Sequence, residues 1–198
     1  MIIPISNEIL NNFQLKNQEY LVDISYYDLP SGQQEYRLYS YLTTFFNNII
    51  ILDIGTLNGR SAVSFSHNET NKVISYDIVN HINNDNHKIY TKNNIEFRLK
   101  DVIEDLNEEI IKDVKIVMID IDHYETVEKR IIKRLKELNF KGIILLDDTT
   151  HHPEPDINVC MNRLWEDIED KKYDLRRYGH FSGTGVVILD ENIDFIFT

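Results

Sequence analysis

The chain has 198 residues, and its 33 acidic side chains outnumber 21 basic ones, for a formal net charge of -12. This length predicts one domain. Hydrophobic residues make up 42% of the chain, which is enough to bury a core and excludes wholesale disorder. The acidic balance disfavours binding to nucleic acid, whose phosphates need clustered Lys and Arg, and docking on an anionic membrane. A cationic ligand or a metal ion suits this charge better.

Cysteine usage and the apolar runs predict where the protein works. The single cysteine, Cys160, cannot form an internal disulfide, which is typical of a reducing compartment. The N-terminus carries neither a basic region nor a long apolar stretch, so no signal peptide is expected. Asp53 and Asp120 interrupt the most apolar runs, and no window approaches a membrane span. The sequence therefore predicts a cytoplasmic protein.

Residues 1–48 are predicted to form an N-terminal helical arm or cap. A short amphipathic stretch comes first, and a helix is expected to begin near Ser31, with Tyr36, Tyr39 and Leu42 on one apolar stripe. Residues 49–198 are predicted to form one compact unit. We expect the arm either to close over a ligand or to pack on a second subunit, which would give a homodimer.

From residue 49 onward, short apolar runs alternate with helical stretches. The alternation indicates a parallel sheet with helices on both faces. Buried strands are expected at residues 49–54, 73–78, 95–99, 116–121 and 142–146. The runs at residues 185–189 and 194–197 follow one another without a helix, so they are expected to pair antiparallel. The prediction is an α/β fold with a doubly wound, mostly parallel seven-stranded sheet and an antiparallel C-terminal hairpin.

A glycine-containing loop follows the first expected strand, from Asp53 to Ser61. Gly55 and Gly59 would let the backbone pass close to a ligand, although the same glycines also suit a plain tight turn. Leu57 stands where a dinucleotide-binding loop has its second glycine. Asp77 ends the second strand, 18 residues after Gly59, where a carboxylate can accept hydrogen bonds from two ribose hydroxyls.

This acid-x-Gly-x-x-x-Gly loop, followed by a strand-end acid, resembles class I S-adenosylmethionine-dependent methyltransferases over residues 49–189. The resemblance implies a Rossmann-like methyltransferase fold with S-adenosylmethionine as cofactor. It places Gly55 beside the methionine part, Asp77 on the ribose and Asp101 beside the adenine; Asp101 would equally serve as a helix N-cap. The implied cofactor-binding residues are Asp53, Gly55, Thr56, Asn58, Gly59, Ser61, Asp77, Asp101 and Asp120.

Acidic residues gather at the ends of the fourth and fifth strands. Asp120 and Asp122 end one, and Asp147 and Asp148 end the other, with no Lys or Arg in either segment. Neighbouring buried carboxylates repel each other strongly, so a divalent cation such as Mg²⁺, Mn²⁺ or Ca²⁺ is expected between them. The alternative is that Asp147 and Asp148 cap their own loop while Asp122 faces solvent.

The acid pairs also resemble the metal-dependent O-methyltransferases of the catechol and caffeoyl-CoA type, and more closely the macrocin-type enzymes that methylate sugars. This resemblance implies Asp120, Asp147 and Asp148 as metal ligands. His123 would be the general base beside Asp120, its pKa suited to that task at neutral pH. The alternative for His123 is a surface histidine at a helix start.

The predicted function is a metal-assisted O-methyltransferase that acts on a hydroxyl of a small molecule or sugar. Two alternatives stay open: a non-catalytic module that binds S-adenosylmethionine, and an NAD-dependent oxidoreductase. His151 and His152 are expected either in a polar loop or at the substrate. The segment from His180 to Gly185 is expected to form a glycine-rich turn, with the acceptor pocket as the alternative.

Overall fold

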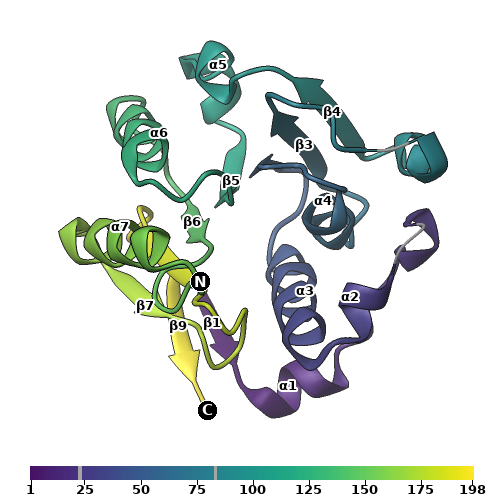
Figure 1. Cartoon of the computed structure of the whole chain (residues 1–198), viewed down its shortest axis with the longest axis horizontal. Coiled ribbons are helices and arrows are strands. Elements are labelled where there is room, and N and C mark those ends of the chain that lie inside the picture. The colour runs from purple at the N-terminus through teal and green to yellow at the C-terminus, as the bar shows by residue number, and fades with distance from the viewer. Residues whose placement is uncertain (22–23, 83) are drawn as a thin grey trace.

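The computed structural model describes residues 1–21, 24–82 and 84–198. Its main sheet has seven strands in the order β4-β3-β2-β5-β6-β8-β7 (Figure 1). The strands are β2 (Ile50–Ile54), β3 (Lys72–Asp77), β4 (Ile95–Leu99), β5 (Val114–Ile119), β6 (Ile143–Leu146), β7 (Lys172–Asp174) and β8 (Gly185–Ile188). The first five are parallel, and β8 runs antiparallel to both of its neighbours. The predicted doubly wound, mostly parallel sheet is confirmed.

Strand residues alternate between two hydrophobic cores, one on each face of the sheet. In β2, Ile51 joins the first core and Leu52 the second, and Met118 and Val117 of β5 divide in the same way. Helices α3 (Pro30–Thr43) and α4 (Arg60–Phe65) cover the first face. Helices α6 (Thr126–Glu137) and α7 (Pro155–Asp167) cover the second. Burial on both faces explains why these strands are apolar throughout.

The C-terminal end departs from the expected pairing. An antiparallel hairpin is present, but it joins β7 to β8, whereas the sequence predicted pairing of residues 185–189 with residues 194–197. Strand β9 (Asp194–Phe197) leaves the main sheet and pairs in parallel with β1 (Ile2–Ile5). The chain ends therefore lie side by side (Figure 1). Strand β7 has only three residues, so its sequence carries too short an apolar pattern to reveal it.

The described part of the first 48 residues contains β1 and several helices. These are the short helices α1 (Asn7–Asn12), η1 (Gln18–Tyr20, a 3-10 helix) and α2 (Ser25–Asp28), and the longer α3. The expected stripe on α3 is buried, including Tyr36, Tyr39 and Leu42. The helix begins at Pro30, one residue before Ser31. The division into residues 1–48 and 49–198 stays a prediction.

The remaining short helices lie in connections of the sheet. They are η2 (Asn84–Thr91), η3 (Val102–Glu104) and α5 (Glu108–Ile111). Among the described residues, no helix has both the length and the apolar character needed to cross a membrane.

Candidate active site

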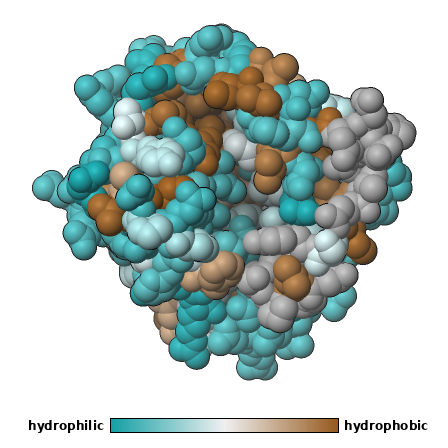
Figure 2. All heavy atoms as spheres, in the orientation of Figure 1, coloured by the Kyte–Doolittle hydropathy of each residue, from teal (hydrophilic) through white to brown (hydrophobic). Residues whose placement is uncertain are grey.

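A cavity of about 560 Å³ lies at the carboxyl ends of β2, β3 and β5. The connections from β2 and β5 run to opposite sides of the sheet here, and ligands of open α/β sheets bind at such a switch point. The molecular surface is hollowed on this face, with hydrophobic side chains at the rim (Figure 2). Its apolar walls include Ile54, Ile78, Val102, Ile121 and Val127. We call this space the cofactor cavity.

The glycine loop approaches the cavity at one glycine and turns away at the other. Gly55 has φ +104° and lines the cavity, and a Cβ there would overlap the carbonyl oxygen of Asp120. Gly59 has φ +82°, and a Cβ there would meet Ile89 of η2. Gly59 is not among the lining residues of the cavity. Both glycines are thus required by backbone conformation and close packing.

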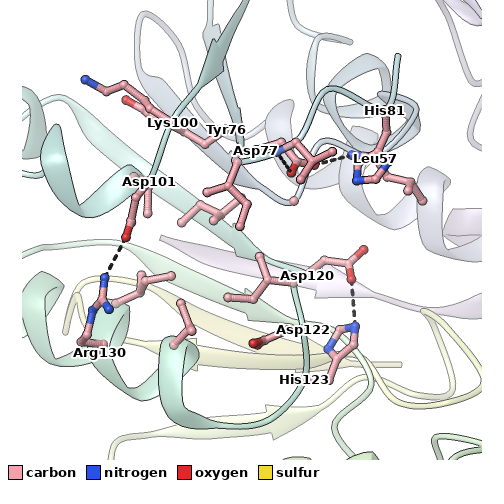
Figure 3. A pocket seen from close by; sticks show the side chains of 18 residues that line it. Leu57, Tyr76, Asp77, His81, Lys100, Asp101, Asp120, Asp122, His123 and Arg130 are labelled. Carbon is pink, nitrogen blue, oxygen red and sulfur yellow. Dashed lines mark hydrogen bonds and ion pairs between the residues drawn. The ribbon is translucent and has the colours of Figure 1, made fainter. Parts of the chain in front are cut away.

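Asp77 and Asp101 line the cavity, and the protein itself holds both carboxylates in place (Figure 3). The backbone N–H of Leu57 donates to Asp77 Oδ2 at 3.1 Å, and that of Val79 donates to Oδ1 at 3.0 Å. Asp101 Oδ1 accepts from the backbone N–H of Ile103 and caps η3, while its Oδ2 pairs with Arg130 at 2.8 Å. Asp101 therefore combines the N-cap role and the cavity position, which the sequence had offered as alternatives.

Asp53, Thr56, Asn58 and Ser61 complete the predicted cofactor set but do not line this cavity. Asp53 is 1% exposed within β2, where Oδ2 accepts from Ser75 at 2.6 Å and Oδ1 has no partner. Burial raises the pKa of Asp53 to about 7, although the Ser75 and Ser61 hydroxyls oppose the rise. Thr56 lies beside Ser75 and lines a smaller neighbouring cavity of about 200 Å³.

His123 stands between the end of β5 and the end of β6. Its Nε2 lies 3.3 Å from Asp120 Oδ1, the contact drawn as a dashed line in Figure 3, and 3.4 Å from Asp148 Oδ2. The side chain is only 12% exposed, so His123 is not a surface histidine. Burial lowers the pKa of His123, but the nearby carboxylates of Asp120, Asp148 and Glu128 outweigh it and raise the pKa above its usual value.

Asp147, Asp148 and His180 form a second centre next to the cavity, which we call the acid–histidine cluster. One ligand atom from each of the three lies within 4.8 Å of the others. Asp147 is buried, and its Oδ1 has no hydrogen-bond partner. The Ser182 hydroxyl contacts both Asp148 Oδ1 and His180 Nδ1. The segment from His180 to Gly185 is thus more than a turn, because it contributes to the site.

Electrostatics set Asp147 and Asp148 apart. Burial, together with the Asp120, Glu35 and Asp148 carboxylates, raises the pKa of Asp147 well above its usual value. Burial acts to raise the pKa of Asp148, but hydrogen bonds with His180 and Ser182, together with the charges of His123 and His152, lower it below its usual value. His152 Nε2 lies 3.6 Å from Asp148 Oδ2, whereas His151 contacts Arg176 at 2.8 Å. Asp122 is exposed at the cavity rim.

No protein-family model and no curated protein sequence matches this chain. Solved structures do match in fold. The SAH-bound methyltransferase PaMTH1 from Podospora anserina aligns with a TM-score of 0.60 at 14% identity, over 95% of this chain and 98% of that one. The chain has the Rossmann-like methyltransferase fold.

Two further structures give the same result. The O-methyltransferase from Bacillus cereus in complex with SAH has a TM-score of 0.57 and 16% identity, with 93% of this chain and 92% of that one covered. Cofactor-bound Rv0187 from MTB has a TM-score of 0.59 and 16% identity, with 83% of each chain covered. At such low identity the likeness shows the fold alone.

Within this methyltransferase fold, two buried glutamates belong to the site and were missed in the sequence. Glu35 of α3 is 5% exposed, accepts a hydrogen bond from Tyr39 at 3.0 Å and interacts electrostatically with Asp147 and His180. Burial raises the pKa of Glu35 to about 7. Glu128 of α6 is fully buried and accepts a hydrogen bond from the backbone N–H of His123 at 2.9 Å. Each stands on the apolar stripe of its helix, and that placement was the available signal.

Proposed function

We propose that the protein is an S-adenosylmethionine-dependent O-methyltransferase that acts on a hydroxyl of a small molecule or sugar. The observation that carries this proposal is the cofactor cavity, which opens onto the paired side chains of Asp120 and His123. The acid–histidine cluster lies directly beyond that pair. The fold likeness adds support, because the matched structures include an O-methyltransferase in complex with SAH.

The residues of the cavity fit S-adenosylmethionine. A volume of about 560 Å³ lies within the usual range for pockets that hold small ligands. Each oxygen of Asp77 accepts one backbone N–H, which leaves lone pairs for two ribose hydroxyls. Apolar walls beside Asp101 would hold the adenine, and Gly55 would lie along the methionine part. When bound, S-adenosylmethionine supplies a methyl group activated by its sulfonium charge.

In this proposal, the neutral form of His123, with Nε2 unprotonated, takes the proton of the acceptor hydroxyl at Nε2, and the carboxylates that raise its pKa make it a stronger base. An alcohol is a poor nucleophile, and removal of its proton by a positioned base typically accelerates a reaction by about 10²–10⁴-fold. Asp120, whose Oδ1 lies 3.3 Å from Nε2, stabilises the imidazolium that forms. Glu128 fixes the backbone of His123, which has φ 60°. The His123 side chain is only 12% exposed, which limits the contact of its imidazole with bulk water.

The acid–histidine cluster fits a divalent cation, because the buried Asp147 Oδ1 has no hydrogen-bond partner and several carboxylates surround it. Asp147 and Asp148 would hold the ion, and Asp120 is the third ligand expected from the sequence. Mg²⁺ is the ion expected for oxygen ligands, with Mn²⁺ or Ca²⁺ as alternatives. A divalent ion in this position would lower the pKa of a nearby acceptor hydroxyl.

The decisive test combines SAH binding with the loss of one side chain. We expect isothermal titration to show that both the wild-type protein and His123→Ala bind SAH. Transfer of labelled methyl from S-adenosylmethionine to a panel of sugar and small-molecule hydroxyls should fall about 100-fold or more in His123→Ala. The matched control is His151→Ala, which removes a neighbouring histidine that contacts Arg176.

Three outcomes would contradict the proposal. Undiminished transfer by His123→Ala would remove the assigned base. SAH binding without transfer to any acceptor would instead indicate a binding module. Binding of NADH in a fluorescence titration, with no binding of SAH, would indicate an oxidoreductase.

A further inference from the structure

The carboxylate of Asp147 is buried without a partner for one of its oxygens. The residue is 6% exposed, and Oδ1 accepts no hydrogen bond. Burial of an unpaired carboxylate oxygen is strongly unfavourable, and the neighbouring Asp148 and Glu35 add negative charge. The local structure therefore favours a cation at this oxygen.

His180 lies where it can share such a cation. Its Nδ1 is 3.8 Å from Asp147 Oδ1 and 3.6 Å from Asp148 Oδ1. Two ligand atoms that each bind one ion at about 2.0–2.2 Å lie about 3–4 Å apart. The observed separations match that range, so the three side chains can bind one ion with little rearrangement.

The Ser182 hydroxyl offers a competing explanation, since it contacts both Asp148 Oδ1 and His180 Nδ1. Its single hydrogen goes to Asp148, so the contact with His180 requires a proton on Nδ1. The Nδ1 lone pair can hold that proton or a metal ion. A proton there makes His180 an ion-pair partner of Asp147 at 3.8 Å but gives Oδ1 no hydrogen bond, whereas an ion among the three side chains would contact this oxygen directly. The unpartnered oxygen therefore favours the ion.

We propose that His180 is the third protein ligand of a cation held by Asp147 and Asp148, and that this cation is a first-row transition ion such as Mn²⁺. Mg²⁺ and Ca²⁺ prefer sites made only of oxygen, whereas an imidazole nitrogen suits Mn²⁺, Fe²⁺, Co²⁺ or Zn²⁺. This ligand set differs from the three carboxylates expected from the sequence. It leaves Asp120, whose side chain is 39% exposed, to pair with His123 at the cavity.

The proposal extends the proposed function, but its test needs neither S-adenosylmethionine nor an acceptor. Mn²⁺ alone is titrated into the full-length chain, and pulsed electron paramagnetic resonance detects any directly bound imidazole through its ¹⁴N modulation. We expect the modulation in the wild-type protein and its loss in His180→Gln, with Mn²⁺ affinity reduced at least about 10–100-fold. His152→Gln, a matched change beside Asp148, should keep the modulation.

Further variants separate the alternatives. Asp120→Asn should leave the modulation unchanged and lower the Mn²⁺ affinity less than His180→Gln does, because Asp120 contributes only charge. Ser182→Ala should retain the modulation because His180 remains. Absence of modulation in the wild-type protein, or undiminished affinity in His180→Gln, would overturn the role of His180. Loss of affinity in Asp120→Asn but not in His180→Gln would favour the three-carboxylate set. Displacement of Mn²⁺ by equimolar Mg²⁺ would overturn the assigned class of metal.

Thermal unfolding shows whether His180→Gln is folded; if it is not, the wild-type spectrum compared with that of His152→Gln still tests whether the bound imidazole can be that of His180. Failure of this proposal is distinguishable from failure of methyl transfer, since the SAH titration and the His123→Ala assay do not use the Mn²⁺ signal. A protein that binds SAH and transfers methyl while its Mn²⁺ spectrum shows no ¹⁴N modulation would refute His180 alone.

Discussion

The cofactor cavity and the acid–histidine cluster meet at Asp120 and His123, but they differ in how their carboxylates are hydrogen-bonded. In the cavity, Asp77 accepts two backbone N–H groups, and Asp101 accepts one and pairs with Arg130. In the cluster, one oxygen of Asp147 has no hydrogen-bond partner. The carboxylates of the cavity therefore have their partners before a ligand binds, whereas the cluster leaves a buried oxygen that a cation from outside the chain could contact.

This difference indicates how the two centres would share one reaction. A cavity with satisfied walls can bind a cofactor without reorganising, which limits the entropic cost of binding. A cluster with unsatisfied carboxylates is stabilised by whatever cation it binds, so its occupancy is linked to the stability of the fold. Asp120 would be the point of contact, since it lines the cavity and lies beside His123.

The largest effect is expected from Gly55→Ala, because Gly55 lines the cavity and packs against the backbone carbonyl of Asp120. Alanine there must adopt φ +104° and place its Cβ inside the Asp120 carbonyl oxygen. Backbone strain of about 1–3 kcal/mol and overpacking of about 1–3 kcal/mol should together lower the free energy of unfolding by about 2–6 kcal/mol. Urea denaturation with an unchanged m-value would measure this, and SAH affinity should fall with stability.

Gly59→Ala is the matched control for that experiment. Its φ of +82° is also strained, but its Cβ would meet only the flexible end of Ile89. We expect a loss of about 1–3 kcal/mol. Equal losses in the two variants would mean that close packing of Gly55 on Asp120 contributes nothing to stability.

Two substitutions, one in the cavity and one in the cluster, test whether the two regions bind their ligands independently. Asp77→Asn weakens a charged acceptor of ribose hydroxyls, and hydrogen bonds to charged groups contribute about 1.5–3 kcal/mol, so SAH affinity should fall about 10–150-fold. Mn²⁺ affinity should not change. Asp148→Asn should do the reverse, with SAH affinity kept and Mn²⁺ affinity lowered at least about 10–100-fold. Isothermal titration of each ligand measures all four values.

The exposed acid Glu104 supplies the control for this pair, because Glu104→Gln removes the same charge near the cavity without touching either centre. It should leave both affinities unchanged. A variant of the pair that loses affinity for both ligands would show that the cavity and the cluster are one coupled site.

Much of the site was predictable because it depends on local pattern. Asp77, Asp101, Asp120 and the Asp147–Asp148 pair each follow an apolar strand run, and parallel strands bring their carboxyl ends to one edge. The sheet was predictable for the same reason. The hairpin partner was not, since β7 is three residues long and half-buried, and its pairing is decided by contacts with β8.

The rest of the site depends on tertiary contacts that no spacing encodes. Glu35 reaches the cluster because α3 packs on the first face of the sheet, and His180 reaches it because β8 lies beside β6. Gly59 was predicted to lie close to the cofactor, but it does not line the cavity, and Ile89 of η2 packs where its side chain would be. An acid on a buried stripe, as in Glu35 and Glu128, is the signal worth seeking in similar sequences.

Asp53 is an exception to this difference between the cavity and the cluster, and substituting it is expected to have the smallest effect. It lies on the cavity side of the molecule, yet like Asp147 it is buried with an unpartnered oxygen. Burial raises its pKa to about 7, above its ordinary value, so between about pH 4 and 7 the folded protein holds a proton that the unfolded chain has released. The free energy of unfolding should therefore fall as pH rises through that window.

Asp53→Asn removes this pH dependence. As pH rises from 4 to 7, the free energy of unfolding of the variant should therefore increase by about 1–2 kcal/mol relative to that of the wild-type protein. This is less than the full linkage between the two pKa values would give, because the surroundings of a buried charge partly relax around it. Urea denaturation at several pH values measures the difference. Burial lowers the pKa of His67 to about 4, which gives an opposite slope in the same window, so variant and wild-type proteins must be compared at each pH. Parallel curves would show that Asp53 is ionised in the folded protein, and that the cavity region satisfies this acid as it does Asp77.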